Sequence, residues 1–236
     1  MSKSQSFDLE IFPPFTGFPT AAIEFFKRLK KNNNREWFAK HKTEYEELIK
    51  FPMQCLIASL QIPMAKIMPE IEINPKRNIF RIHRDTRFSK NKSPYKTNVA
   101  AVFHLKGHWQ DSAGYYVHIE PGNIYVGGGI YMPDGHQIKL IRSAIAERQN
   151  EFQSIVNAKV LKKKFGSLEG DKLQRAPLGY SPDNPMIEWL KHKSFYTGVE
   201  WKEKECFSEK FLDNIAVVYK DLEPLIRFLN ESLGKI

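Results

Sequence analysis

Cysteine is scarce in this sequence of 236 residues, which contains only Cys55 and Cys206. The two lie far apart and match no spacing of a metal site or of a disulfide framework. Cys55 falls within an apolar helical pattern, which favours a buried and unreactive thiol. So few cysteines are typical of a reducing compartment, and we expect a cytoplasmic location.

Long apolar runs are also missing. No stretch of about 18 apolar residues occurs, and no apolar segment of the signal-peptide type follows Lys3. We therefore expect a soluble protein with no membrane partner.

Common nucleotide and hydrolase motifs are absent as well. Gly127-Gly128-Gly129 is not followed by the Gly-Lys-Ser/Thr of a P-loop and lacks the spacing of a dinucleotide fingerprint. No Gly-x-Ser-x-Gly elbow occurs. Three glycines inside an apolar strand pattern are more typical of a bulge, or of close packing beneath aromatic side chains such as Tyr131.

Positive charge is present, and it is concentrated in one segment. The chain has 36 basic and 27 acidic residues, and the window Lys76–Lys96 alone holds eight basic residues and one acid, Asp85. The remaining 28 basic and 26 acidic residues nearly balance. A surface that wraps nucleic acid would spread its cations over several elements, so this clustering favours a local anion site.

Helical spacing predicts helices on both sides of a central strand region. We expect a helix from Thr20, acting as cap, to about Lys31, and a second helix from Arg35 capped by Asn34. Pro52 should kink or restart that helix, which would run to about Gln61. After the strands, helices are expected over 134–164 with a break near Asn150, over 184–192 and over 208–233.

Alternating apolar residues predict four consecutive strands, over 80–83, 99–105, 115–119 and 124–131. Glu120-Pro121-Gly122-Asn123 is a type II turn sequence between the last two. Short connections favour an antiparallel meander, so we predict an α+β fold with N- and C-terminal helices packed against a β-meander of about four or more strands. We expect residues 1–19 to form an irregular arm, held by Phe12, Phe15 and Phe18, and 20–236 to form a single domain.

The basic segment supplies the candidate site. If Phe80 and Ile82 face the core, Arg81 and His83 face outward, and Asp85 and Arg87 continue that row. Arginines suit bidentate contact with phosphate or carboxylate, and hydroxyl groups add neutral donors. Asp85 is a lone carboxylate among cations, so its pKa should be low and its role that of an ion-pair partner rather than a proton donor. The candidate ligand-binding residues are Arg35, Arg81, His83, Arg84, Asp85, Arg87, Ser89, Lys92, Tyr95 and Lys96.

Three functional hypotheses remain open. The first is binding of a small anionic, phosphorylated ligand by this segment, with enzymatic activity undecided. The second is a nucleic-acid binding module in which Tyr95, Trp109 and Tyr116 stack on bases. The third is a protein-interaction domain for an acidic partner. A structural alternative is that the arginines clamp the loop's own carbonyls and carboxylate.

A metal site is not expected. His83, His104 and His118 could share a sheet face, but no Asp or Glu recurs with them at ligand spacing. Histidines in such a pattern are more often hydrogen-bonded than metal-bound.

The motifs resemble an uncharacterised bacterial and fungal family, domain of unknown function 2461. The resemblance rests on the following segments: Asn33–Phe38 with His41, Lys42 and Tyr45; Arg84–Ser89; Lys92–Thr97; Gly114–Tyr116; Gly127–Gly129 with Pro133; Arg142; Pro177, Gly179 and Tyr180; and Lys193–Phe195. It implies one domain and brings no established activity. Asn91 stands where the family pattern often has Asp, and Leu178 where it often has Arg.

The resemblance groups the polar motif residues of the Arg35 helix with those of the 84–96 loop. We expect this loop to fold over the sheet edge near the start of the Arg35 helix, forming one polar pocket.

Overall fold

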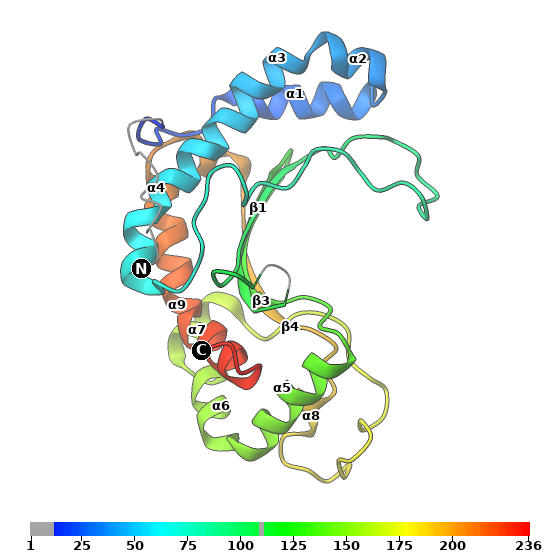
Figure 1. Cartoon of the computed structure of the whole chain (residues 1–236), viewed down its shortest axis with the longest axis vertical. Coiled ribbons are helices and arrows are strands. Elements are labelled where there is room, and N and C mark those ends of the chain that lie inside the picture. The colour runs from blue at the N-terminus through cyan, green and yellow to red at the C-terminus, as the bar shows by residue number, and fades with distance from the viewer. Residues whose placement is uncertain (1–11, 109–110) are drawn as a thin grey trace. The chain divides into compact units, whose positions relative to one another are not determined.

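Four strands form one antiparallel sheet in the order β1-β2-β3-β4 (Figure 1). They are β1 (Val99–Phe103), β2 (Gly114–Glu120), β3 (Asn123–Ile130) and β4 (Phe195–Trp201). The computed structural model describes residues 12–108 and 111–236. The prediction of an α+β fold built on an antiparallel meander is confirmed.

Helices lie before β1, between β3 and β4, and after β4. The first group is α1 (Thr20–Lys31), α2 (Arg35–Lys40), α3 (Lys42–Tyr45) and α4 (Phe51–Ile67), with a π-helical turn at Glu46–Lys50. The second group is α5 (Gly135–Glu147), α6 (Gln149–Val156), α7 (Lys159–Phe165), α8 (Ile187–Leu190) and α9 (Lys210–Ser232), with a 3₁₀ turn at Glu203–Phe207.

The chain forms two compact units. Unit 1 contains residues 1–103, 116–125 and 200–216, and unit 2 contains 104–115, 126–199 and 217–236. The single domain over 20–236 stays a prediction.

The two faces of β2 differ in burial. Tyr115, Val117 and Ile119 are buried, and the Tyr115 ring lies 4.6 Å from that of Tyr219 on α9. Tyr116 and His118 point to the opposite face and are half-buried. The alternation therefore separates a core face from a partly open face.

The prediction of a strand over 80–83 is wrong. This segment makes two isolated bridges, Ile79 with Ala101 and His83 with Tyr95, and the chain bends at Ile82 between them. The predicted burial alternation holds only in part. Ile82 is buried while Arg81 and His83 are exposed. Phe80, expected to face the core, is half-buried, because the Ile79–Ala101 bridge places it on the face of β1 opposite to Ala101 and Phe103.

The fourth strand lies elsewhere in the sequence. β4 follows a long helical segment. Its buried residues alternate over only two positions, Phe195 and Thr197. Too few alternating residues remained to predict it.

Glycines set two features of the β2–β3–β4 region. Gly122 has φ +86°, as a type II turn between β2 and β3 requires. Gly129 has φ +136°, and a Cβ there would lie 2.1 Å from the carbonyl oxygen of Phe195. Close packing at the triple glycine is thus confirmed, but its partner is the β4 backbone, and Tyr131 is exposed.

The first helices largely follow the prediction. α1 spans Thr20–Lys31, but Pro19 occupies the N-cap and Thr20 is already helical. The Asn34 side chain accepts from the Trp37 N–H at 2.9 Å and caps α2 as predicted. α4 continues past the predicted end at Gln61, with Pro63 inside it.

The later helices are more fragmented than predicted. The 134–164 region forms three helices, with the first break at Arg148 close to the expected position. The predicted helix over 184–192 is reduced to α8, whereas α9 matches the predicted 208–233 within two residues.

One continuous helical stretch, Lys42–Ile67, is long and apolar enough to cross a membrane by length and composition. The core helix of a soluble protein passes the same test, and Leu56, Ile57 and Leu60 are fully buried. About 44% of this apolar window is buried, so the stretch contributes to the core.

The described part of the N-terminal arm is anchored as predicted. Phe12, Phe15 and Phe18 are buried, and the Phe15 and Phe18 rings meet edge-on at 5.5 Å. The rest of the predicted arm, residues 1–11, lies outside the described residues.

Acid should weaken the fold through His192. This residue is 1% exposed and stacks with Trp189, and burial, followed by the charge of Lys172, lowers its pKa to about 4. The unfolded chain takes up a proton near pH 6.5 and the folded chain does not, so stability is lost as the pH falls from about 6.5 towards 4. The free energy of unfolding of the wild type should decrease between pH 7 and pH 5. Urea titrations should show that this decrease is smaller in His192→Phe by on the order of 1–2 kcal/mol. His136→Phe changes an exposed histidine and should lose as much stability between pH 7 and 5 as the wild type does. If wild type and His192→Phe lose equal stability over this range, His192 is not the cause.

Candidate functional site

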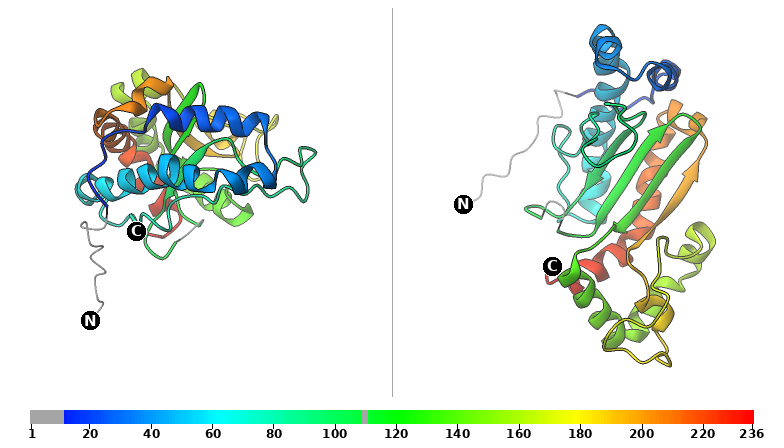
Figure 2. Two further views of the ribbon diagram at one scale, coloured as in Figure 1. Left: turned by 90° about the horizontal axis from the view of Figure 1, so that it is seen from above. Right: turned by 90° about the vertical axis from the view of Figure 1, so that its right-hand side faces the viewer.

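The basic segment forms a hairpin that projects from unit 1 (Figures 1 and 2). Its two sides are joined by the bridge between His83 and Tyr95 and by two backbone hydrogen bonds. Arg84 N–H donates to the Pro94 carbonyl at 2.9 Å, and Lys96 N–H donates to the Ile82 carbonyl at 2.8 Å. We call residues 81–96 the basic hairpin.

Asn33 fastens this hairpin to the turn before α2. Its amide donates to the Tyr95 carbonyl at 2.9 Å and its oxygen accepts from the Tyr95 N–H at 3.0 Å. The Tyr95 ring stacks on Phe38 at 4.1 Å and is 6% exposed. Tyr95 is therefore an anchor, and it does not present a stacking surface to a ligand.

The structure brings the hairpin and the start of α2 together, as expected. Arg35 opens α2 two residues after Asn33 and is exposed. Within 12–108 and 111–236, Arg35 makes no hydrogen bond or ion pair. The pocket shared by Arg35 and Arg87 stays a prediction.

At the outer end of the hairpin, Asp85 and Arg87 form a two-pronged ion pair. Arg87 Nε and Nη2 donate to the carboxylate at 3.1 and 2.8 Å, and the Arg87 N–H also reaches it at 3.2 Å. These contacts hold the pKa of Asp85 down to about 2. The predicted low pKa and ion-pair role of Asp85 are confirmed.

Two further cations bind the hairpin's own acceptors. Lys92 donates to the Thr86 carbonyl at 3.0 Å, and Arg84 reaches the Ser93 carbonyl and the Ser89 hydroxyl at 3.4 Å each. Arg84, Arg87 and Lys92 thus shape the hairpin, as the structural alternative proposed.

Phe88 stands at the apex and is 95% exposed. Its described contact is with the Arg87 guanidinium, whose carbon lies 5.8 Å from the ring centre. Nothing in the fold accounts for an aromatic ring so fully in water.

Lys96 is half-buried, as Arg84 is, but within 12–108 and 111–236 its ammonium donates no hydrogen bond, whereas Arg84 reaches Ser93 and Ser89. Its ammonium lies 5.0 Å from the centre of the Phe80 ring. Burial, and then the positive charge of Arg81, lower its pKa. Among the residues that the structure describes, no carboxylate forms an ion pair with Lys96.

Phe80 begins a set of rings on the open face of the sheet. The Phe80 and Tyr116 centroids are 6.4 Å apart, and Tyr116 lies 6.3 Å from Tyr125. His118 stacks on Tyr125 at 5.9 Å, with 20° between the planes. We call Phe80, Tyr116, His118 and Tyr125 the aromatic row; all four belong to unit 1.

Sequence reasoning identified only Tyr116 of this row as a stacking group. Strand parity carried the missing signal, because Tyr116 and His118 alternate with the buried Tyr115, Val117 and Ile119. Trp109, the third predicted stacking group, lies outside the described residues. Across 12–108 and 111–236, no group of three or more His, Cys, Asp or Glu side chains is placed to hold a metal ion.

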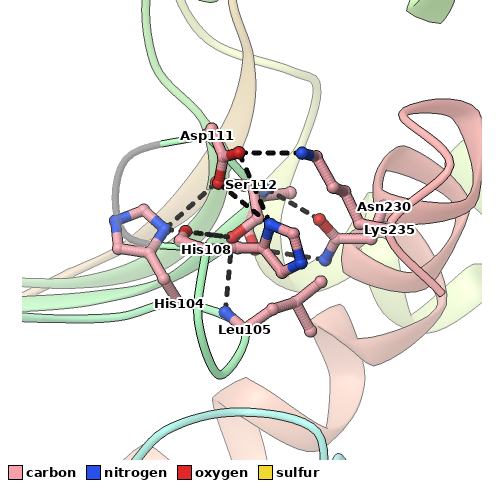
Figure 3. A network of polar contacts seen from close by, with 8 residues as sticks. His104, Leu105, His108, Asp111, Ser112, Asn230 and Lys235 are labelled. Carbon is pink, nitrogen blue, oxygen red and sulfur yellow. Dashed lines mark hydrogen bonds and ion pairs between the residues drawn. The ribbon is translucent and has the colours of Figure 1, made fainter.

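A polar cluster in unit 2 has residue types found in serine hydrolases (Figure 3). Ser112 Oγ lies 3.4 Å from His104 Nδ1, and His108 contacts Asp111 at 3.3 Å. However, Ser112 is 1% exposed, and its hydroxyl donates to the His108 carbonyl at 3.1 Å. The hydroxyl is inaccessible and its proton is already used, so the cluster is structural.

The same cluster is tied to the end of α9. Asn230 accepts from the Ala113 N–H at 2.9 Å and donates to the Ala113 carbonyl at 3.1 Å, and Lys235 reaches Asp111 at 2.7 Å. These contacts hold Asp111 and Ala113 to the C-terminal residues of unit 2.

A pocket of about 560 Å³ lies in unit 2 at the loop 174–182, lined in part by Arg175, Tyr180 and Lys191. Leu178, where the family pattern often has Arg, is fully exposed. Arg142 donates to the carbonyls of Leu190 and His192 at 2.7 and 3.1 Å. This motif arginine therefore fixes the backbone next to α8.

Removing the Asn33 side chain should loosen the hairpin. Asn33→Ala deletes both bonds to Tyr95, so we expect the Tyr95 amide proton to exchange at least about tenfold faster, with a loss of about 1–3 kcal/mol in stability. Hydrogen exchange measured by NMR tests this. Asn32→Ala at the adjacent exposed position is the control, and unchanged exchange at Tyr95 in Asn33→Ala would contradict the role of this contact.

Asn230→Ala should be among the more destabilising changes in unit 2. It leaves the buried N–H and carbonyl of Ala113 without their partner, which costs about 2–4 kcal/mol. Chemical denaturation should detect this loss, while Asn157→Ala, at an exposed position, should change stability by less than about 0.5 kcal/mol. Equal effects of the two changes would show that the Asn230 contacts contribute little.

Comparison with known proteins agrees with the motifs. A family model described as conserved hypothetical protein (DUF2461) matches residues 21–228, which is most of the chain. No curated protein sequence matches. The matched range contains the Asn33 turn, the basic hairpin and the aromatic row. The chain therefore belongs to the DUF2461 family of conserved hypothetical proteins.

Proposed function

We propose that the protein binds a small anionic, phosphorylated ligand at the base of the basic hairpin, through Lys96 and Arg81. The observation that carries this proposal is the half-buried side chain of Lys96, which lies over the Phe80 ring, has no carboxylate partner among the described residues and feels the positive charge of the exposed Arg81. Buried charges are normally paired, and an uncompensated one is a candidate for a binding site.

Electrostatics supports an anion at this position. Desolvation and the charge of Arg81 both disfavour the charged form of Lys96. A phosphate bound to Lys96 would offset both effects, because its negative charge favours the ammonium and charge-assisted hydrogen bonds to phosphate are strong.

The site lies at the base of the hairpin rather than at its apex. Arg84, Arg87 and Lys92 already hold Ser93, Asp85 and Thr86, whereas Arg81 is exposed and its charge lowers the pKa of Lys96. The contacts of Arg84, Arg87 and Lys92 fix the conformation of the hairpin, and this conformation positions Lys96. The proposal concerns binding alone.

A second candidate function has its own observation. The exposed Phe88 ring, with Lys90 and Lys92 nearby in sequence, suits a nucleic-acid strand, on whose bases it would stack. An acidic protein partner is the remaining alternative for the apex. Binding to nucleic acid would fall steeply with added salt, and binding of a small ligand at Lys96 would fall less.

We also propose a cytoplasmic location. Cys55 and Cys206 are both buried and free, and burial raises the pKa of each thiol. Unpaired, unreactive thiols suit a reducing compartment.

Calorimetric titration with sugar phosphates, nucleotides and polycarboxylates tests the proposed function. Lys96→Gln and Arg81→Gln should each weaken binding of the responding phosphorylated compound by about tenfold or more, because each removes a charge-assisted hydrogen bond. Lys76→Gln, exposed in the same charged window, should bind as wild type does. A response that is equal in all four proteins, or absent from the whole phosphorylated panel, would refute the Lys96 site.

A further inference from the structure

We infer that the ligand of the Lys96 site is a nucleotide, with its base stacked on the aromatic row and its phosphate at Lys96 and Arg81. This inference rests on the proposed function and names the class of ligand. Three features of unit 1 support it: the position of the rings next to the cations, the exposure of the rings, and the charge at the far end of the row.

The aromatic row adjoins the cationic site, because its first ring, Phe80, contacts Lys96. Phe80 contacts the Lys96 ammonium on one side and faces Tyr116 on the other, at 5.0 and 6.4 Å. The Phe80 N–H bonds the Ala100 carbonyl, and Ile79 pairs with Ala101, so Phe80 and Ala100 share a sheet face. Ala100 has a small side chain, so little of the Phe80 ring is covered from this position of β1, and Phe80 remains half-buried.

The rings of the row remain partly open. Tyr116, His118 and Tyr125 are half-buried, although residues of the same strands on the opposite face are buried completely. A flat heterocycle would cover these rings, and stacking of a base on an aromatic side chain is favourable for every base. A ligand with a phosphate alone would leave this surface unused.

Carboxylates lie at the other end of the row. Glu120 is 4.0 Å from His118 Nε2, and Glu200 is close enough that its charge acts on the pKa of His118. Carboxylates accept hydrogen bonds from ribose hydroxyls or from amino groups of a base. They also repel phosphates, so a continuous strand of nucleic acid along the row would meet negative charge. The row therefore fits one nucleotide better than a polynucleotide.

The test compares four small probes, and a ten-nucleotide single strand as a fifth, on the full chain by calorimetry. The small probes are the nucleoside 5′-monophosphates, adenosine, ribose 5-phosphate and inorganic phosphate. We expect at least one nucleoside monophosphate to bind about tenfold or more tightly than ribose 5-phosphate and inorganic phosphate. Adenosine should be weaker than its monophosphate by a similar factor.

Tyr116→Leu removes the ring nearest Phe80 while keeping an apolar side chain. It should weaken nucleotide binding about tenfold or more and leave binding of ribose 5-phosphate and inorganic phosphate unchanged. Tyr131→Leu, which removes an exposed tyrosine of unit 2, is the matched control and should have no effect. Thermal melting of both variants confirms that each is folded.

The outcomes separate the two proposals. If ribose 5-phosphate binds as tightly as every nucleotide, or if Tyr116→Leu weakens all phosphorylated probes equally, the nucleotide inference fails and the Lys96 anion site stands. If no phosphorylated probe binds, both fail. If a ten-nucleotide single strand binds more than about tenfold tighter than any monophosphate, the inference is overturned in favour of nucleic acid.

Discussion

At the base of the basic hairpin the side chain of Lys96 is half-buried, and the positive charge of the exposed Arg81 acts on it. Such an arrangement is unfavourable in the free protein, because water is removed from one cation and a like charge is brought near it. Folding tolerates it because the surrounding contacts fix the hairpin. The proposed site depends on this constraint, since a relaxed hairpin would let Lys96 reach solvent.

The contacts that impose the constraint come from several parts of unit 1. Asn33 bonds both backbone groups of Tyr95, the residue next to Lys96, and Phe38 packs on the Tyr95 ring. At the outer end, the Asp85–Arg87 pair and the Lys92 contact with Thr86 shape the apex. The charged residues of one segment thus have different roles. Some hold the hairpin together, and Lys96 and Arg81 remain available to a ligand.

Local patterns predicted much of the fold and only part of the site. The Asn34 cap, the type II turn at Gly122 and the meander follow from short-range sequence rules. β4 did not follow from them, because it pairs with β3 across a long helical segment. The charge pattern located the hairpin, but it could not tell Arg87, which pairs with Asp85, from Arg81. The contact between Phe80 and Tyr116 depends on which residues the bridge at Ile79 places side by side, and the sequence does not encode that register locally.

The most direct test of the central claim is an NMR titration of the lysine Cε–Nζ groups over an alkaline pH range, with and without inorganic phosphate, with Lys96 assigned through Lys96→Arg. Lys96 should titrate below the ordinary lysine pKa of about 10.4, and phosphate should raise its pKa because a bound anion favours the ammonium. Phosphate should leave the Lys76 signal unaffected. A Lys96 pKa at the ordinary value that does not respond to phosphate would contradict the claim that a half-buried, uncompensated charge forms the anion site.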